Sequence, residues 1–271
     1  MPPPSLPEIV AFLALLATSA ALFWRRFGPV LATIRAARPE PGFSLYPIGG
    51  RVKDFIFEVL LQSKVIRERP LPGLAHAFVF WGFLAFALVT LNHFATGLGI
   101  PFLAEDSAYF YFAGIFAVAV VISITGLFIR RFFARPRWLG EQISKESGFI
   151  AALIVIVMLT FWPSASKLLW WTHTLALLVF LPLVPHTKHL HLILSPITVF
   201  LSRGSFAQIP PLEGDEDFGL HTGKDLTQII ALQVYSCVEC GRCMEHCPAV
   251  ATGKESSDVP VNGKRILQTA C

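Results

Sequence analysis

The sequence predicts an all-α protein, a polytopic bundle of five membrane-spanning helices followed by a small cytoplasmic α-helical segment of ferredoxin-like type. Hydrophobic residues make up 54% of the 271 residues and charged residues only 15%, and the mean hydropathy is +0.60. A soluble globular chain rarely has this composition. The apolar residues also form runs long enough to cross a hydrocarbon core about 30 Å thick. Four of the five cysteines lie between Cys237 and Cys247, which sets the tail apart from the bundle.

The first apolar run extends from Leu6 to Trp24 and is followed directly by Arg25 and Arg26. A secretory signal peptide is the alternative, but such a signal has its basic residues before the apolar run. We therefore expect an uncleaved helix whose N-terminus lies outside the cell.

The segment 29–72 is basic and contains apolar residues at helical spacing. These residues are Val52, Phe55, Ile56, Val59 and Leu60. Such a pattern is typical of an amphipathic helix on a membrane surface. We expect this helix on the inner surface.

Four further apolar runs follow within a membrane domain that covers 73–196. We expect their helices at about 73–97, 108–129, 148–162 and 168–194. The turn between the second and third spans contains Glu105 and Asp106 but no basic residue.

The basic residues predict the orientation of the chain. In a five-span arrangement, all of the 22 Lys and Arg residues except Lys167 fall on one side. Because basic loops stay in the cytoplasm, the cysteine-containing tail is predicted to be cytoplasmic. The chain is then a multi-pass protein of the plasma (inner) membrane.

The tail begins after Pro196. We expect an exposed linker at 197–222, which contains Pro210 and Pro211, and a metal-binding segment at 223–271. Within that segment we expect a short helix from Asp225 to Tyr235 and a terminal amphipathic helix from Val261 to Cys271.

The tail cysteines have the spacing C-x2-C-x2-C-x3-C-P. They are Cys237, Cys240, Cys243 and Cys247, followed by Pro248. Thiolates at this spacing are typical ligands of a [4Fe–4S] cluster. Structural zinc is one alternative, but zinc sites usually place two C-x2-C pairs well apart. A disulfide framework is another, and a reducing cytoplasm disfavours it.

Four histidines lie inside the predicted spans, where polar side chains are costly and need a reason. His76 and His191 are predicted at the cytoplasmic level, and His93 and His173 near the outer level. Imidazoles from two antiparallel helices can ligate a haem iron axially.

The spacing of these histidines favours the pair His76 and His191. His173 and His191 are 18 residues apart, about five turns of one helix and hence on one face. His76 and His93 fit a common face less well, and prolines at 182 and 185 can kink the helix.

Two more histidines, His186 and His189, flank Lys188 at the predicted cytoplasmic edge. We interpret them as interfacial residues. His189 is the reserve ligand if a kink turns His191 away.

Two stretches resemble known families. The residues from Gly73 to Phe83, with Pro185 to His191, resemble the membrane domain of the nitrate reductase gamma subunit. The cysteine run, with Ala251-Thr252-Gly253-Lys254 after it, resembles the iron–sulfur region of heterodisulfide reductase D-like proteins. Fusion of the two is characteristic of membrane-bound iron–sulfur oxidoreductases proposed to link electron-transferring flavoprotein to quinone.

The resemblance implies a [4Fe–4S] cluster and one or two haem b groups. This chain departs from the family pattern in two places. The gamma-subunit family has its second histidine of the helix where this chain has Phe86. The fused relatives also continue into further cysteine-rich regions, whereas this sequence ends at Cys271. In two-cluster ferredoxins the fourth cysteine of a run serves the other cluster. Either Cys247 completes a single cluster, or Cys271 helps to bind it, or the sequence is a fragment. We expect a fragment, with Cys271 a plain thiol.

The resulting hypothesis is an electron-transfer oxidoreductase. It would pass electrons between a cytoplasmic flavoprotein or iron–sulfur protein and the membrane quinone. A non-catalytic cytochrome b and iron–sulfur anchor subunit is the first alternative, and a zinc-stabilised membrane scaffold is the second. Paired carboxylates, a nucleophile elbow and a phosphate loop are all missing from the sequence, so hydrolysis and phosphoryl transfer have no support.

Overall fold

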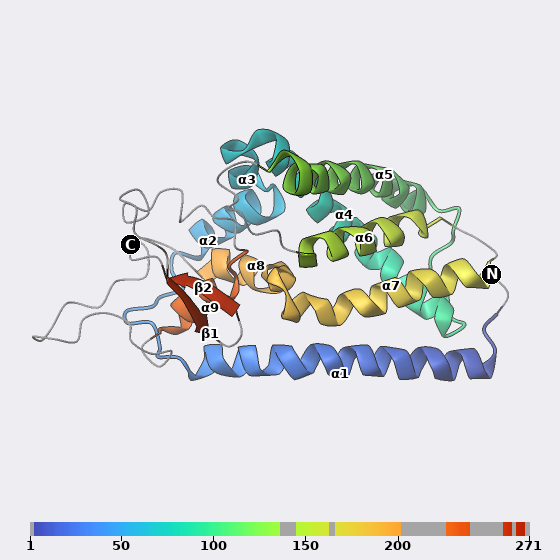
Figure 1. Cartoon of the computed structure of the whole chain (residues 1–271), viewed down its shortest axis with the longest axis horizontal. Coiled ribbons are helices and arrows are strands. Elements are labelled where there is room, and N and C mark those ends of the chain that lie inside the picture. Colours follow the sequence, from blue (N-terminus) through green and yellow to red (C-terminus); the bar gives the residue numbers. More distant parts are fainter. Residues whose placement is uncertain are drawn as a thin grey trace, which may run out of the picture. The chain divides into compact units, whose positions relative to one another are not determined.

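The computed structural model describes residues 3–135, 145–162, 166–201, 226–238, 257–261 and 264–268. The chain divides into two units, and each is described by itself. The first comprises residues 1–26, 60–135 and 143–187, and the second comprises 27–59, 136–142 and 188–271. Helices dominate both units (Figure 1).

The first unit is a helix bundle in which helices that follow one another in the sequence pack together. Helix α1 (Leu6–Ala36) belongs to it as far as Arg26. Its other helices are α3 (Ser63–Glu68), α4 (Pro70–Gly97), α5 (Ala108–Ile129) with the π-helical segment Arg130–Ala134, α6 (Lys145–Leu159) and α7 (Lys167–His186).

Four helices among the described residues are long and apolar enough to cross a membrane: α1, α4, α5 with its π-helical end, and α7. The expected span at 148–162 corresponds to α6, which has 15 residues. At 1.5 Å per residue such a helix rises only about 22 Å, less than a hydrocarbon core. The membrane character is thus supported, and the count of five spans stays a prediction.

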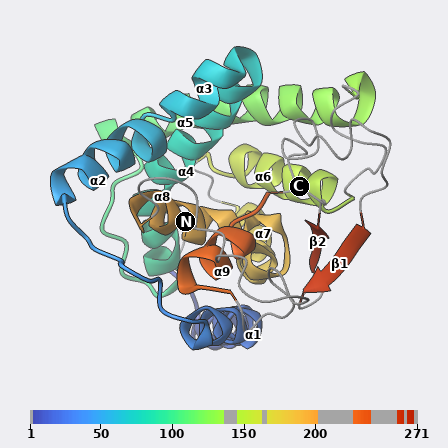
Figure 2. The same cartoon turned by 90° about the vertical axis from the view of Figure 1, so that its left-hand side faces the viewer.

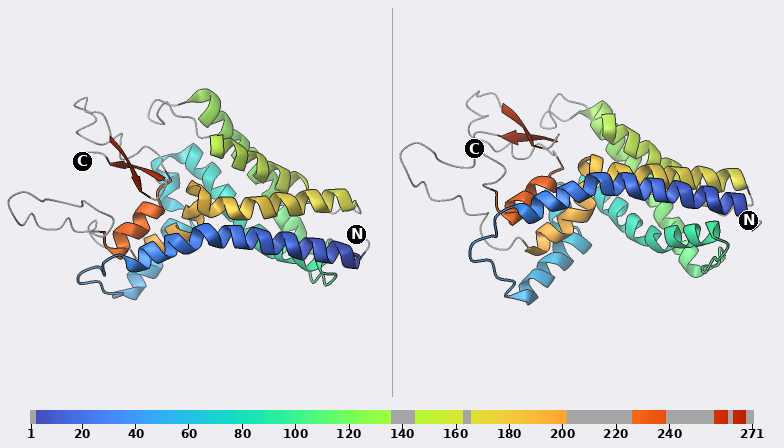
Figure 3. Two further views of the ribbon diagram at one scale, coloured as in Figure 1. Left: turned by 60° about the horizontal axis from the view of Figure 1, so that its bottom comes forward. Right: turned by 90° about the horizontal axis from the view of Figure 1, so that it is seen from below.

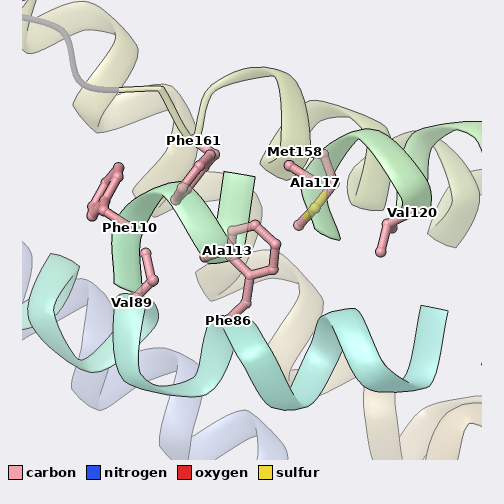
Figure 4. Close-up of a cluster of buried hydrophobic side chains, with 8 residues drawn as sticks. All are labelled: Phe86, Val89, Phe110, Ala113, Ala117, Val120, Met158 and Phe161. Atoms are coloured by element: carbon pink, nitrogen blue, oxygen red, sulfur yellow. The ribbon is translucent and has the colours of Figure 1, made fainter. Parts of the chain in front are cut away.

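The core of the first unit joins α4, α5 and α6 (Figure 4). Phe161 packs edge-on against Phe86, with ring centroids 4.8 Å apart, and stacks on Phe110 at 4.7 Å. A Cβ at Gly82 would collide with the side chain of Val120 on α5. Small residues let membrane helices approach closely in this way.

Helix α1 packs along α7 through polar and aromatic contacts. The buried hydroxyl of Ser19 donates to the Leu178 carbonyl oxygen at 2.7 Å, and Lys167 Nζ lies 2.8 Å from the Glu8 carboxylate. These contacts place the first turns of α1 and α7 at one end of the unit. The predicted topology has the same feature, because it puts the N-terminus and Lys167 on one side.

The expected single helix at 168–194 is wrong, because α7 ends at His186. Two prolines in its last turns, Pro182 and Pro185, lack the N–H that a continuing helix needs. Thr187 is extended, with φ −125° and ψ 177°. The chain then forms a 3₁₀ turn, Lys188–Leu190, and starts helix α8 (His191–Leu201). His173 and His191 are therefore on different helices, and the five-turn spacing argument does not apply to them.

The second unit contains the end of α1, α2 (Ile48–Asp54) continuing into a π-helical segment (Phe55–Leu60), α8, and α9 (Gln228–Tyr235). The apolar residues from Val52 to Leu60 are helical as expected, in α2 and its π-helical continuation, and the place of this helix on a membrane surface stays a prediction. Figure 3 shows α1 as one continuous helix, and Figure 2 shows α8 and α9. Their shared core consists of Val30, Leu190, Leu194, Leu232 and Tyr235.

In the tail, one of the two predicted helices is confirmed and the other is wrong. The short helix before the cysteines is α9, capped by the Thr227 hydroxyl, which accepts from the Ile230 N–H. The helix expected from 261 is instead an antiparallel hairpin of β1 (Ser257–Val261) and β2 (Lys264–Gln268). Asn262-Gly263 between alternating apolar residues is a strong hairpin signal that the helical interpretation overlooked.

Candidate functional site

The cysteine run begins where α9 ends. Cys237 is exposed and its N–H donates to the Val234 carbonyl oxygen at 3.2 Å. Cys240, Cys243, Cys247 and Cys271 lie outside the described residues. The arrangement of the predicted cluster ligands therefore stays a prediction.

Helix α9 is fixed to α8 just before Cys237. The hydroxyls of Ser236 and Thr198 lie 2.7 Å apart, and the apolar core of the second unit fills the space between the two helices. His191 begins α8, two turns before Thr198. The second unit thus holds the first predicted cluster ligand and one predicted haem ligand on two packed helices.

Arg51 holds the other end of α8, a role that the sequence did not reveal. It is only 4% exposed, and its Nη1 donates to the carbonyl oxygens of Phe200 (2.8 Å) and Leu201 (2.6 Å). Nε and Nη2 donate to the Leu45 and Ser44 carbonyl oxygens. A cation at these carbonyls satisfies the C-terminus of the helix and complements its dipole.

The rings of His76 and His191 are each anchored through Nδ1. His191 Nδ1 lies 2.8 Å from the Lys188 carbonyl oxygen, an acceptor only. His76 Nδ1 lies 3.2 Å from Gln62 Oε1. Each Nδ1 therefore carries the hydrogen, and the lone pair of the neutral ring is on Nε2. Metal-binding histidines are typically anchored in this way through their other nitrogen.

Gln62 was not singled out from the sequence, although its conformation marks it. Its side chain is 6% exposed, and its backbone is left-handed with φ 53°. A non-glycine residue rarely adopts this conformation, and it often does so at a functional site. His76 and His191 belong to different units, so their pairing stays a prediction.

His93 and His173 lie together in the first unit, at one level of antiparallel helices as predicted. Their ring centroids are 4.5 Å apart with 55° between the planes, and His93 stacks on Trp170 at 5.0 Å. His93 Nε2 lies 2.7 Å from the Thr174 hydroxyl, and His173 Nδ1 lies 2.9 Å from the Thr160 hydroxyl. Neither threonine was identified from the sequence.

This pair does not fit a haem as it stands. Two axial imidazoles sit on opposite sides of an iron, each about 2 Å from it, by analogy with other metal–imidazole bonds. Rings whose centroids are 4.5 Å apart are in contact and leave no room for a porphyrin plane. The adjoining cavity has a volume of about 70 Å³, far below the roughly 300–1,000 Å³ of drug-sized ligand pockets. A haem here would require the rings to separate.

His186, interpreted as interfacial, and His189, the reserve ligand, differ in their surroundings. His186 is exposed, and its Nδ1 lies 2.7 Å from the Pro182 carbonyl oxygen. The ring centroid of His189 is 6.1 Å from that of His191. In the described part of the chain, no three His, Cys, Asp or Glu side chains converge as metal ligands.

The chain is similar to two curated oxidoreductases. One, the "EtfAB:quinone oxidoreductase" of Syntrophomonas wolfei, is 29% identical, and the match covers 74% of this chain and 35% of the relative. The other, a probable iron–sulfur-binding oxidoreductase of Bacillus subtilis, is 28% identical, and the match covers 71% of this chain and 33% of the relative.

No family model matches the chain, and no solved structure matches it. The chain spans about a third of the length of the curated relatives that it matches. These comparisons, together with the apolar helices, support an iron–sulfur oxidoreductase of the membrane as the kind of protein to which this chain is related.

Proposed function

We propose that the chain is the membrane part of an electron-transfer oxidoreductase of this kind. It passes electrons between a cytoplasmic partner and the membrane quinone, through a [4Fe–4S] cluster and one haem b. The observation that carries the proposal is the C-x2-C-x2-C-x3-C-P run directly after α9, in a chain similar to proteins named as iron–sulfur oxidoreductases.

The cluster ligands in this proposal are Cys237, Cys240, Cys243 and Cys247. When bound, the cluster and the haem accept and release single electrons, which is chemistry that side chains do not supply. The second unit would position the first thiolate through the fixed end of α9. Arg51 and the shared core would hold α8 and α9 against each other, so that His191 and Cys237 keep a constant spacing within the second unit.

The haem ligands in this proposal are Nε2 of His76 and Nε2 of His191. Support comes from the Nδ1 anchors, which orient each ring and raise its basicity as a ligand. His189 remains the reserve for His191. Because a second haem at His93 and His173 would require their rings to move apart, we propose one haem.

The partner is a soluble flavoprotein of the electron-transferring type or an iron–sulfur protein, and the diffusible substrate is quinone. The name of the Syntrophomonas relative supports both. The distribution of basic residues supports a cytoplasmic tail and an external N-terminus in the plasma membrane.

Visible spectroscopy tests the proposal. The purified protein should show reduced b-type haem bands, and these bands should be lost when His76 or His191 is replaced by Ala. Intact bands in both variants would overturn the ligand assignment. Loss of non-haem iron from Cys240→Ser, with the haem bands retained, would separate the cluster from the haem.

A second candidate is a non-catalytic anchor that carries electrons for a separate catalytic subunit. The match covers only about a third of each curated relative, so this candidate is kept beside the first. Catalytic cysteine-rich domains in the same polypeptide as this chain would support the enzyme, and such domains in a separate subunit would support the anchor.

A further inference from the structure

The contacts of His93 and His173 identify which ring nitrogen carries the hydrogen. The Thr174 hydroxyl donates its only hydrogen to the Trp170 carbonyl oxygen at 2.8 Å. It must therefore accept from His93, so the hydrogen of His93 is on Nε2.

The same reasoning applies to His173. The Thr160 hydroxyl donates to the Ile156 carbonyl oxygen at 2.6 Å and must accept from His173, so the hydrogen of His173 is on Nδ1. The neutral rings then have opposite tautomers. Their lone pairs are on Nδ1 of His93 and Nε2 of His173.

The pair lines a polar cavity of about 70 Å³. A water molecule needs about 10–15 Å³ of such volume and two to four polar partners, so the cavity has room for several. Besides the histidines, the polar residues that line it are Asn92, Thr96, Glu105 and Thr160. Trp170 also lines it, and its buried Nε1–H has no acceptor among the described groups. Buried N–H groups are usually satisfied, which is a second reason to expect water there.

The cavity has one acidic residue near the aqueous phase. Glu105 is exposed in the turn between α4 and α5. The titratable residues that line the cavity in the described structure are His93, His173 and Glu105. The nearby charges of Glu8 and Lys167 pair with each other.

We propose that His93 and His173 form a hydrated proton-binding site in the place where a second haem was expected. The rings are so close that two positive charges would repel each other, so the pair holds one proton at a time. The pair takes this proton from cavity water reached past Glu105 and supplies it for the reduction of quinone. This inference rests on the proposed function, because quinone consumes one proton with each of the two electrons it accepts on becoming hydroquinone.

The tautomers can be read by ¹⁵N NMR of histidine-labelled, full-length protein. We expect one residue with hydrogen on Nε2, whose signal is lost in His93→Gln, and one with hydrogen on Nδ1, whose signal is lost in His173→Gln. Metal-bound shifts for either residue, or the same tautomer for both, would overturn the assignment. This measurement does not depend on haem or on activity.

The proton role can be tested by reoxidation of dithionite-reduced protein with a short-chain quinone, followed at the haem band. His173→Ala should slow reoxidation about 100-fold, a typical contribution of general acid–base catalysis, while the haem content stays unchanged. Added imidazole should restore at least a tenth of the lost rate. Thr160→Val keeps the His173 imidazole and should slow reoxidation less than His173→Ala does. This second variant keeps the test valid if the Ala variant misfolds.

His186→Ala is the matched control, because this histidine is exposed on the same helix and lies outside the cavity. It should neither slow reoxidation nor respond to imidazole. A drop in haem content in His93→Gln or His173→Gln would show haem ligands and overturn the proton site. Absence of haem and of quinone reduction in the wild type would instead overturn the proposed function, and the NMR result would still decide the state of the pair.

Discussion

The two histidine pairs differ in how their rings are anchored and in what lies next to them. His76 and His191 each have Nδ1 at hydrogen-bond distance from an oxygen, that of the Gln62 side chain and that of the Lys188 carbonyl group. His93 donates through Nε2 and His173 through Nδ1, and these two rings touch each other beside a polar cavity. Under the two proposals above, the same residue type would serve two tasks, and the hydrogen-bond partner of each ring determines which nitrogen keeps the lone pair.

The largest expected effect separates the two pairs directly. His76→Ala and His191→Ala should each abolish haem binding, because each variant removes one of the two imidazoles that would hold the haem. His93→Ala and His173→Ala should leave the haem content unchanged. The pyridine haemochrome assay measures this, and haem loss in the second set would mean that the pairs are alike.

Replacing an anchor should have a smaller effect than replacing a ligand. Gln62→Leu removes the acceptor of His76 Nδ1–H but leaves the ring in place. Haem affinity should fall by about 10–100-fold, the usual effect of removing an outer partner of a metal ligand. Titration of haem into the apoprotein measures it, with Gln62→Asn as a partial rescue. An unchanged affinity would show that the Gln62 contact has no role in orienting His76.

Replacing Arg51 should lower the stability of the second unit without changing any of the four histidines. Arg51→Met leaves the buried carbonyl oxygens at the end of α8 without donors, at a cost of about 3 kcal/mol in the free energy of unfolding. Arg51→Lys should recover only part, because an ammonium cannot reproduce the forked geometry. Denaturant unfolding measures the loss, and a loss equal to that of the exposed Lys53→Met control would contradict the capping role.

Part of this architecture was predictable from the sequence, and the successful parts depend on long or strongly patterned segments. The apolar runs located α1, α4, α5 and α7 because the hydrocarbon core imposes a minimum length on any span. A short helix was predicted from Asp225 to Tyr235, and α9 lies within these bounds. The levels of His93 and His173 followed from the alternating direction of the helices.

The errors have local physical causes. Pro185 and the extended Thr187 end α7 earlier than its hydropathy suggests, because a proline removes a helix donor whatever the apolar content. Strands β1 and β2 pair as a hairpin although their apolar residues also fit a helix, and the Asn-Gly sequence between them is a typical hairpin signal. The roles of Gln62, Arg51 and Thr160 depend on contacts between segments far apart in the sequence, and spacing carries no signal of these. Thr174 could have been singled out from the sequence, since it directly follows His173.

The smallest expected effect concerns the close packing of α4 against α5 at Gly82. Gly82→Ala would place a Cβ against Val120 where α4 meets α5, and overpacking of this kind costs about 1–3 kcal/mol. Gly126→Ala is the matched control, because no atom lies within 4 Å of its added Cβ. Thermal unfolding in detergent compares the two variants. Equal melting temperatures would contradict the close approach of the helices at Gly82.

The central claim is that this chain joins an iron–sulfur cluster to a single haem. The most direct measurement is the content of non-haem iron, acid-labile sulfide, zinc and haem per polypeptide in one preparation of the protein. The account predicts about four non-haem irons with matching sulfide for each cluster, together with one b-type haem. Zinc without iron, or an absence of haem, would contradict it.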